Sequence, residues 1–129
     1  MRTSIVIFSP FLGRLAALAL RLKSPECATT LVHTDRPLDE ARTCELRPDV
    51  MLVDLRGVEH IAAVRGLLEE FPTTRILFAL PDMPPSAAMA RVVGKHGGAL
   101  LGVDDDVVLT TAMLVAMGAQ RRGVAAHAG

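Results

Sequence analysis

The sequence contains no tryptophan and no tyrosine, and its four phenylalanines make aromatic residues only 3% of the 129-residue chain. Half of the residues are nevertheless apolar, so a core has to be built from aliphatic side chains and methionine. A chain of this length can bury such a core without help from a metal or a disulfide. The composition therefore predicts one domain with an aliphatic core, and it suits an α/β fold.

Net charge is absent as well, because 14 basic and 14 acidic residues cancel. A balanced chain has no overall attraction to nucleic acid or to an anionic membrane. We therefore expect any contact with DNA to come from another domain.

Clustered thiols and imidazoles are also lacking. Cys27 and Cys44 have no CxxC spacing, which is typical of reduced, buried thiols rather than of a disulfide framework. The histidines are scattered along the chain, so they predict no metal or catalytic cluster: His33, His60, His96 and His127.

No apolar run approaches the roughly 20 residues that a membrane span requires. The N-terminal segment resembles a secretory leader only superficially, because Pro10, Gly13 and Arg14 interrupt it. A strand, a turn and a helix account for the same residues. We therefore expect a soluble, cytoplasmic protein with no membrane partner.

What the sequence does contain is a short apolar run followed by a helical pattern, five times over. The expected strands cover residues 5–8, 28–33, 49–55, 74–80 and 99–103, and the expected helices cover residues 9–22, 36–48, 58–71, 86–95 and 107–120. Five such βα units predict a doubly wound α/β fold with a five-stranded parallel sheet. For this flavodoxin/CheY-like (βα)5 arrangement we expect strand order 2-1-3-4-5, with the first and last helices on one face.

The last three units carry a resemblance to a known family. The segments "RPDVMLVDLRG", "FPTTRILFAL" and "GGALLGVDDDVVLTTAMLVAMGAQRRG", in this order and spacing, resemble the receiver domain of bacterial response regulators, particularly the helix-turn-helix (LuxR/NarL-like) class. The resemblance implies a receiver-like domain over residues 1–120. Residues 121–129 are expected to form a linker or tail, which in a longer protein would lead to a DNA-binding effector domain.

The resemblance also places Asp54 at the position of the aspartate that accepts a phosphoryl group from a histidine kinase. Family members surround this aspartate with two acids that hold Mg²⁺, a hydroxyl after strand four and a lysine after strand five. Here Phe8 and Ser9 replace the acids, Leu80 or Ala79 replaces the hydroxyl residue, and Gly102 replaces the lysine. The resemblance therefore implies a degenerate (atypical) pocket with an inactive Asp54, no Mg²⁺, no cofactor and no enzymatic activity.

Two interpretations of Asp54 remain at this point. It is either a relic at a solvated strand end, where the carboxylate is hydrated or accepts hydrogen bonds from the backbone amides of the next loop, or a working acceptor whose metal acids come from Asp82 or from the run Asp104 to Asp106. The simpler expectation for that run is that it caps the last helix, where negative charge is favourable.

The first helix has more apolar residues than one stripe needs, and the last helix is apolar nearly all round. A helix that packs on a sheet with one face should be polar on the other. This surplus predicts a homodimer formed through these two helices. The alternative is that Ala and Met are merely tolerated on their surfaces. The candidate dimer residues are Leu12, Leu15, Ala19, Met113, Leu114 and Met117.

Taken together, these features predict a phosphorylation-independent dimerisation and regulatory module of a transcription regulator. One alternative is a small-molecule sensor whose ligand occupies a crevice around Phe8, Pro10, Leu80 and Pro81. A second alternative is a conventional receiver that a histidine kinase phosphorylates at Asp54.

Overall fold

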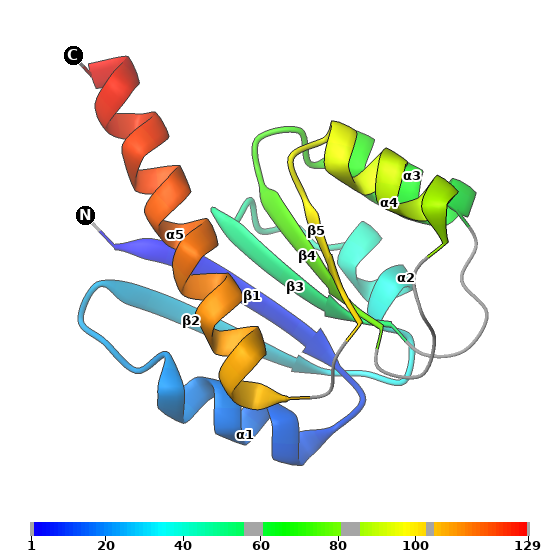
Figure 1. The fold of residues 1–129 in the computed structure, drawn as a ribbon. Helices are drawn as coiled ribbons and strands as arrows, with labels where there is room; N and C mark the ends of the chain where they lie inside the picture. The colour runs from blue at the N-terminus through cyan, green and yellow to red at the C-terminus, as the bar shows by residue number, and fades with distance from the viewer. Residues whose placement is uncertain (1, 56–60, 81–85, 103–104, 129) are drawn as a thin grey trace.

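The computed structural model describes residues 2–55, 61–80, 86–102 and 105–128, and of residues 119–128 only the backbone. Strands and helices alternate along the whole chain (Figure 1). The elements are β1 (Thr3–Ser9), α1 (Leu12–Arg21), β2 (Cys27–His33), α2 (Pro37–Arg42), β3 (Val50–Asp54), α3 (Ile61–Glu70), β4 (Arg75–Ala79), α4 (Ala87–Lys95), β5 (Ala99–Leu101) and α5 (Asp106–Ala128).

The five strands form one parallel sheet in the order β2-β1-β3-β4-β5. This order confirms the predicted α/β fold and its winding. Every residue of β3 is buried, as expected for a central strand that is covered on both faces.

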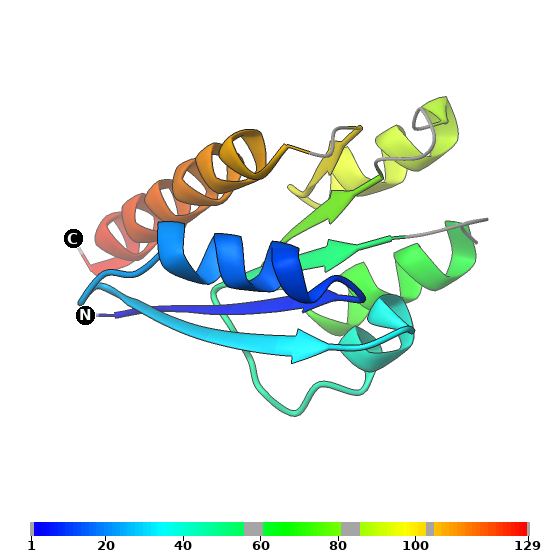
Figure 2. The same cartoon turned by 90° about the horizontal axis from the view of Figure 1, so that it is seen from below.

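Helices cover both faces of the sheet, and α1 and α5 lie on the same one (Figures 1 and 2). On that face Ile5, Leu52 and Met113 belong to one apolar cluster. On the opposite face Val6, Met51 and Val64 belong to a second cluster, which includes side chains from α2, α3 and α4. Successive residues of β1 and β3 thus contribute alternately to the two clusters. The prediction that the first and last helices share a face is confirmed.

Three predicted helix boundaries were wrong. α1 begins at Leu12 rather than near Ser9, because Ser9 is still the last residue of β1 and its carbonyl accepts a hydrogen bond from the Thr34 amide at 3.0 Å. α2 ends at Arg42, where the Thr43 hydroxyl and amide both bond to carbonyls of the last turn. α5 continues to Ala128, so the stretch expected to be a linker from residue 121 is helical up to Ala128.

Among the described residues, no helix combines the length and apolarity needed to cross a membrane.

The turn from α4 into β5 depends on two glycines. Gly97 has a φ of +76°, in the left-handed region that favours glycine. A Cβ on Gly98 would lie 2.6 Å from the Ile76 carbonyl oxygen and 2.9 Å from a methyl of Val93. The close packing of α4 onto β4 therefore requires the absence of a side chain at residue 98.

Gly98→Ala is expected to lower the free energy of unfolding by about 1–3 kcal/mol, because the backbone of β4 has to move to accept the new methyl group. Gly94→Ala is the matched control, since a Cβ there meets nothing within 4 Å and the residue lies in α4. The control should be neutral or more stable by up to about 0.5 kcal/mol. Urea unfolding followed by circular dichroism measures both, and equal stabilities would contradict the packing argument.

Candidate functional site

The candidate site lies where β1 and β3 end side by side. Phe8 is paired with Val53 in the parallel register, so the next residues, Ser9 and Asp54, meet at the carboxyl edge of the sheet. Asp54 is completely buried. The prediction of a hydrated carboxylate at a solvated strand end was therefore wrong.

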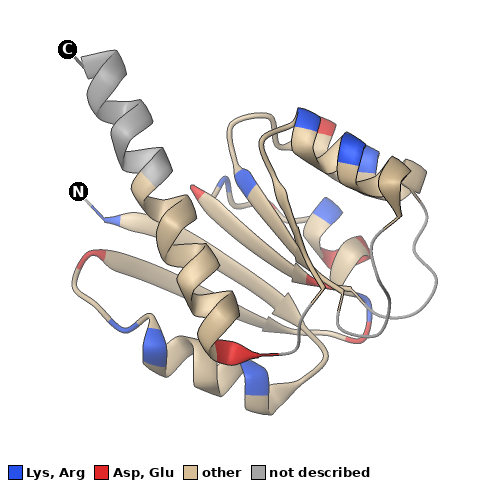
Figure 3. Cartoon of the chain, in the orientation of Figure 1, with Lys and Arg blue, Asp and Glu red and all other residues tan. Residues whose placement is uncertain are grey.

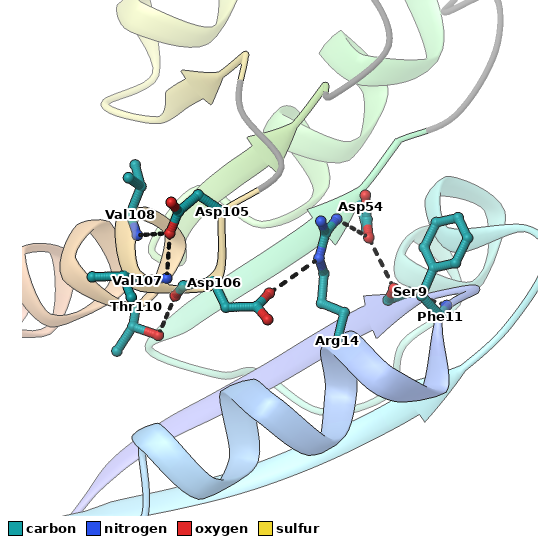
Figure 4. Close-up of polar contacts among 9 residues, drawn as sticks. All are labelled: Ser9, Phe11, Arg14, Asp54, Asp105, Asp106, Val107, Val108 and Thr110. Atoms are coloured by element: carbon teal, nitrogen blue, oxygen red, sulfur yellow. Dashed lines mark hydrogen bonds and ion pairs between the residues drawn. The ribbon is translucent and has the colours of Figure 1, made fainter.

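Ser9 is the first partner of this carboxylate. Its hydroxyl donates a hydrogen bond to Asp54 Oδ2 at 2.9 Å, while its Oγ accepts one from the Phe11 amide at 3.1 Å (Figure 4). The Phe11 contact fixes the position of the hydroxyl just before α1 begins. Ser9 therefore helps to compensate the buried charge rather than beginning α1 as predicted.

Arg14 is the second partner, and it neutralises the carboxylate. Its Nη1 lies 2.6 Å from Asp54 Oδ2, and the two side chains are 7% and 0% exposed. Arg14 is the third residue of α1, so its side chain is close to the end of β1. A buried ion pair of this kind offsets the desolvation of its charges only when its geometry and hydrogen bonding are good. The short contact and the Ser9 bond, both to Asp54 Oδ2, provide part of this compensation.

The same guanidinium reaches α5. Arg14 Nε lies 3.6 Å from Asp106 Oδ1, whose side chain is 37% exposed (Figure 4). Arg14 therefore joins three elements through two carboxylates, namely α1, the end of β3 and the first turn of α5. The longer distance and the exposure of Asp106 make this second contact the weaker one.

The acidic run before α5 is only partly a cap. Asp105 Oδ1 accepts hydrogen bonds from the amides of Val107 at 2.8 Å and Val108 at 3.2 Å, which confirms a capping role for this residue. Asp106 instead contributes to the Arg14 contact. Asp104 and Asp82 lie outside the described residues, so their predicted roles stay untested.

A divalent cation does not fit the described residues of this edge. Phe8 and Leu80 are 2% and 6% exposed and belong to the core, and Gly102 has no side chain to offer. One oxygen of Asp54, Oδ2, is already held by the Arg14 guanidinium, whose positive charge would repel Mg²⁺ from the carboxylate. Within the described ranges, no group of three His, Cys, Asp or Glu side chains is arranged for a metal.

The proposed sensor crevice is not assembled here either. Phe8 and Leu80 pack inward with the cluster on the α2, α3 and α4 face, and Pro81 lies outside the described residues. Phe8 and Leu80 are core residues and offer no surface to a ligand, which leaves the partly exposed Pro10 as the one described member of the set at the surface.

The six predicted dimer residues separate into two groups. Leu15, Met113 and Met117 are at most 3% exposed and belong to the cluster under α1 and α5, so their prediction as surface residues was wrong. Leu12 and Leu114 are 65% and 50% exposed, and Ala19 is partly buried. Further exposed apolar side chains on the two helices are Leu20, Val107, Val108 and Val115.

No family model and no curated protein matches this sequence. Solved structures do share its fold. A two-component response regulator of the LuxR family from Aurantimonas sp. SI85-9A1 is 22% identical, with a TM-score of 0.65 over 92% of this chain and 87% of the other. A response regulator from Burkholderia pseudomallei with a phosphorylated aspartic acid, a calcium ion and citrate is 20% identical, with a TM-score of 0.61 over 98% and 73%.

A third similar structure belongs to a different kind of protein. It is named as a pilus assembly protein (cpaE) from Burkholderia thailandensis and is 18% identical, with a TM-score of 0.64 over 90% of this chain and 98% of the other. The chain thus has the fold of response-regulator receiver domains. Since one fold serves proteins of different roles, the function has to be argued from the site itself.

Proposed function

We propose that this chain is a response-regulator receiver domain that works without phosphorylation, as a self-associating regulatory module for an effector domain. The observation that carries the proposal is the buried ion pair between Arg14 and Asp54. The likeness of the fold to receiver domains supports the general class, and the contents of the site support the independence from phosphorylation.

The ion pair opposes phosphorylation for a chemical reason. A carboxylate oxygen must attack the phosphorus atom, while cations neutralise the charge on the transferred oxygens. Asp54 is completely buried, and its Oδ2 already accepts hydrogen bonds from Arg14 and Ser9. Attack by Oδ2 would require both bonds to break, and attack by either oxygen would have to take place in a buried, ion-paired site. At this edge Phe8 and Ser9 replace the acids for Mg²⁺, and Gly102 replaces the lysine that normally assists.

The surfaces of α1 and α5 support the self-association. The two helices lie next to each other on one face of the sheet (Figures 1 and 2). Leu12 and Leu20 on α1 are 65% and 75% exposed, and Leu114 and Val115 on α5 are 50% and 63% exposed. Figure 3 shows that the described side chains of α5 carry charge only at the start of the helix. Exposed apolar side chains concentrated on neighbouring helices are typical of a protein contact.

The effector remains part of the proposal. In a longer protein a DNA-binding domain would follow α5, and pairing of two chains would set the spacing of two DNA-binding domains. Because the chain itself is electrically neutral, the effector domain would provide the affinity for DNA. The receiver-like module would set the spacing between the two effector domains.

Phosphorylation is tested directly with a small phosphoryl donor. Wild-type protein incubated with acetyl phosphate and Mg²⁺ is expected to gain no phosphoryl group, because Asp54 is buried and ion-paired. Intact-mass spectrometry and peptide mapping provide the measurement. In parallel, beryllofluoride with Mg²⁺ should leave the amide resonances of Ser9, Leu55 and Leu80 unchanged.

Asp54→Asn serves as the control for specificity, since modification elsewhere would persist in this variant. The variant removes the carboxylate that Arg14 contacts at 2.6 Å and is expected to be less stable, so the wild-type peptide map is the primary result. A phosphoryl group mapped to Asp54, or beryllofluoride shifts centred on residues 9 and 55, would refute the independence from phosphorylation and favour a conventional receiver.

A further inference from the structure

A cavity of about 750 Å³ that is largely open to solvent lies at the amino end of the sheet, opposite the edge that holds Asp54. It is formed by the C-terminal end of α1, the connection to β2 and the first part of β2. Its volume falls in the range of small-molecule sites, about 300–1,000 Å³. The lining residues are Arg2, Ala19, Leu22, Lys23, Ser24, Pro25, Cys27, Thr29 and Leu31.

The interior of this cavity is apolar. Leu22 and Cys27 are 2% and 8% exposed and belong to the core, so they form a fixed apolar floor. Cys27 is held further by a contact of 3.9 Å between its sulfur and that of Met117 on α5. Leu31 on the edge strand β2 is 40% exposed, which gives the cavity an apolar side that no other described element covers.

The rim of the cavity is cationic. Arg2 and Lys23 line it, and no Asp or Glu is among the lining residues. The Arg2 guanidinium donates a hydrogen bond from Nη2 to the Cys27 carbonyl at 3.3 Å, which holds it at the mouth. Basic residues lie where α1 ends and where β1 begins, and one acidic residue, Glu26, lies just before β2 (Figure 3). This local excess of positive charge contrasts with the zero net charge of the whole chain.

We propose that the cavity binds a small amphiphilic carboxylate, with its aliphatic part against Leu22 and Leu31 and its carboxylate between Arg2 and Lys23. An apolar floor combined with two cations at the mouth matches a ligand with one anionic end and one apolar end. The hydroxyls of Ser24 and Thr29 also line the cavity and can donate to carboxylate oxygens. The site does not involve Asp54, so the proposal does not depend on whether that residue is phosphorylated.

Octanoate is a suitable probe, with 1-octanol and octylammonium as ligands of the same chain length and different charge. In ¹H–¹⁵N correlation spectra of the full chain, octanoate is expected to shift the amides of Lys23, Ser24 and Thr29 in a saturable manner. The double variant Arg2→Gln/Lys23→Gln should bind octanoate about fivefold more weakly, because two exposed charge contacts each contribute modestly. Octylammonium should cause no saturable shifts at these amides.

A second pair of variants separates the cavity from general surface effects. Leu31→Glu places a carboxylate at the cavity and is expected to weaken octanoate binding at least as much as the double variant. Leu46→Glu is the matched control, because Leu46 is 51% exposed and does not line the cavity, and it should leave binding unchanged. Equal responses to octanoate and octylammonium, shifts located away from this cavity, or unchanged affinity in Leu31→Glu would each overturn the proposal.

Discussion

Replacement of Arg14 by methionine is expected to lower the free energy of unfolding by about 3–5 kcal/mol, the usual cost of removing one partner from a buried ion pair. Methionine preserves most of the length and packing of the side chain, so the loss reports on the charge. The Asp54 carboxylate would keep its Ser9 bond but lose the contact with the Arg14 guanidinium. Because the chain has no Trp or Tyr, urea unfolding is best followed by far-ultraviolet circular dichroism.

Arg21→Met provides the matched control, since Arg21 is the last residue of the same helix and is exposed. Its effect should stay within about 0.5 kcal/mol. The double variant Arg14→Met/Asp54→Leu should recover most of the lost stability, because both buried charges are then gone. A small effect of Arg14→Met, or a double variant no more stable than the single one, would show that the pair is not a buried, coupled unit.

The fold was predictable because its main determinants are local. The apolar run of β3 indicates a strand covered on both faces, and the alternation of short runs with helical patterns indicates a parallel sheet. Helix ends were less predictable, since they depend on particular hydrogen bonds. Ser9 reads as a helix cap in the sequence, yet in the structure it ends β1 and its hydroxyl is directed to Asp54.

The contents of the site were predictable only in part. The sequence correctly indicated that Asp54 would lie at the carboxyl end of the third strand, but it gave no partner for it. Arg14 is 40 residues away, and the two meet only because β1 pairs with β3. One feature of the sequence could have indicated this partner, namely the arginine near the start of a mostly apolar helix. Burial of an arginine is costly unless an acidic side chain pairs with it.

The inward face of α5 could not be predicted for a different reason. The helix is apolar on almost every side up to Gly118, so no polar stripe indicates which residues face solvent. In the structure Met113 and Met117 are buried in the core, whereas Leu114 is exposed. The prediction that α1 and α5 expose surplus apolar surface therefore agrees with the structure. Half of the residues assigned to the dimer face are nevertheless buried, so their assignment was wrong.

The position of Arg14 connects the site to the proposed dimer surface. Its guanidinium contacts Asp54 on β3 and Asp106 at the start of α5, while its backbone belongs to α1. The relative position of α1 and α5 is thus tied to the same charge that compensates Asp54. In the proposed phosphorylation-independent module this linkage gives Asp54 a structural role, because the residue anchors the cation that joins the two helices.

The surface proposal makes the second large prediction. Leu114→Glu is expected to weaken dimerisation at least about 100-fold, because a charge would have to be desolvated within an apolar contact. Leu114 is 50% exposed in the single chain, so the variant should fold normally, with unfolding free energy within about 0.5 kcal/mol of wild type. Sedimentation velocity at increasing protein concentration measures the association.

Leu46→Glu is again the appropriate control, since Leu46 has similar exposure, 51%, but lies outside α1 and α5. It should dimerise as the wild type does. Leu12→Glu should act like Leu114→Glu if both helices contribute, whereas an effect of Leu114→Glu alone would restrict the contact to α5. A wild-type chain that stays monomeric at roughly tens of micromolar and above would remove the basis for the dimer. The Arg14 and Asp54 pair would then stabilise a single folded domain rather than the spacing of two helices in a shared surface.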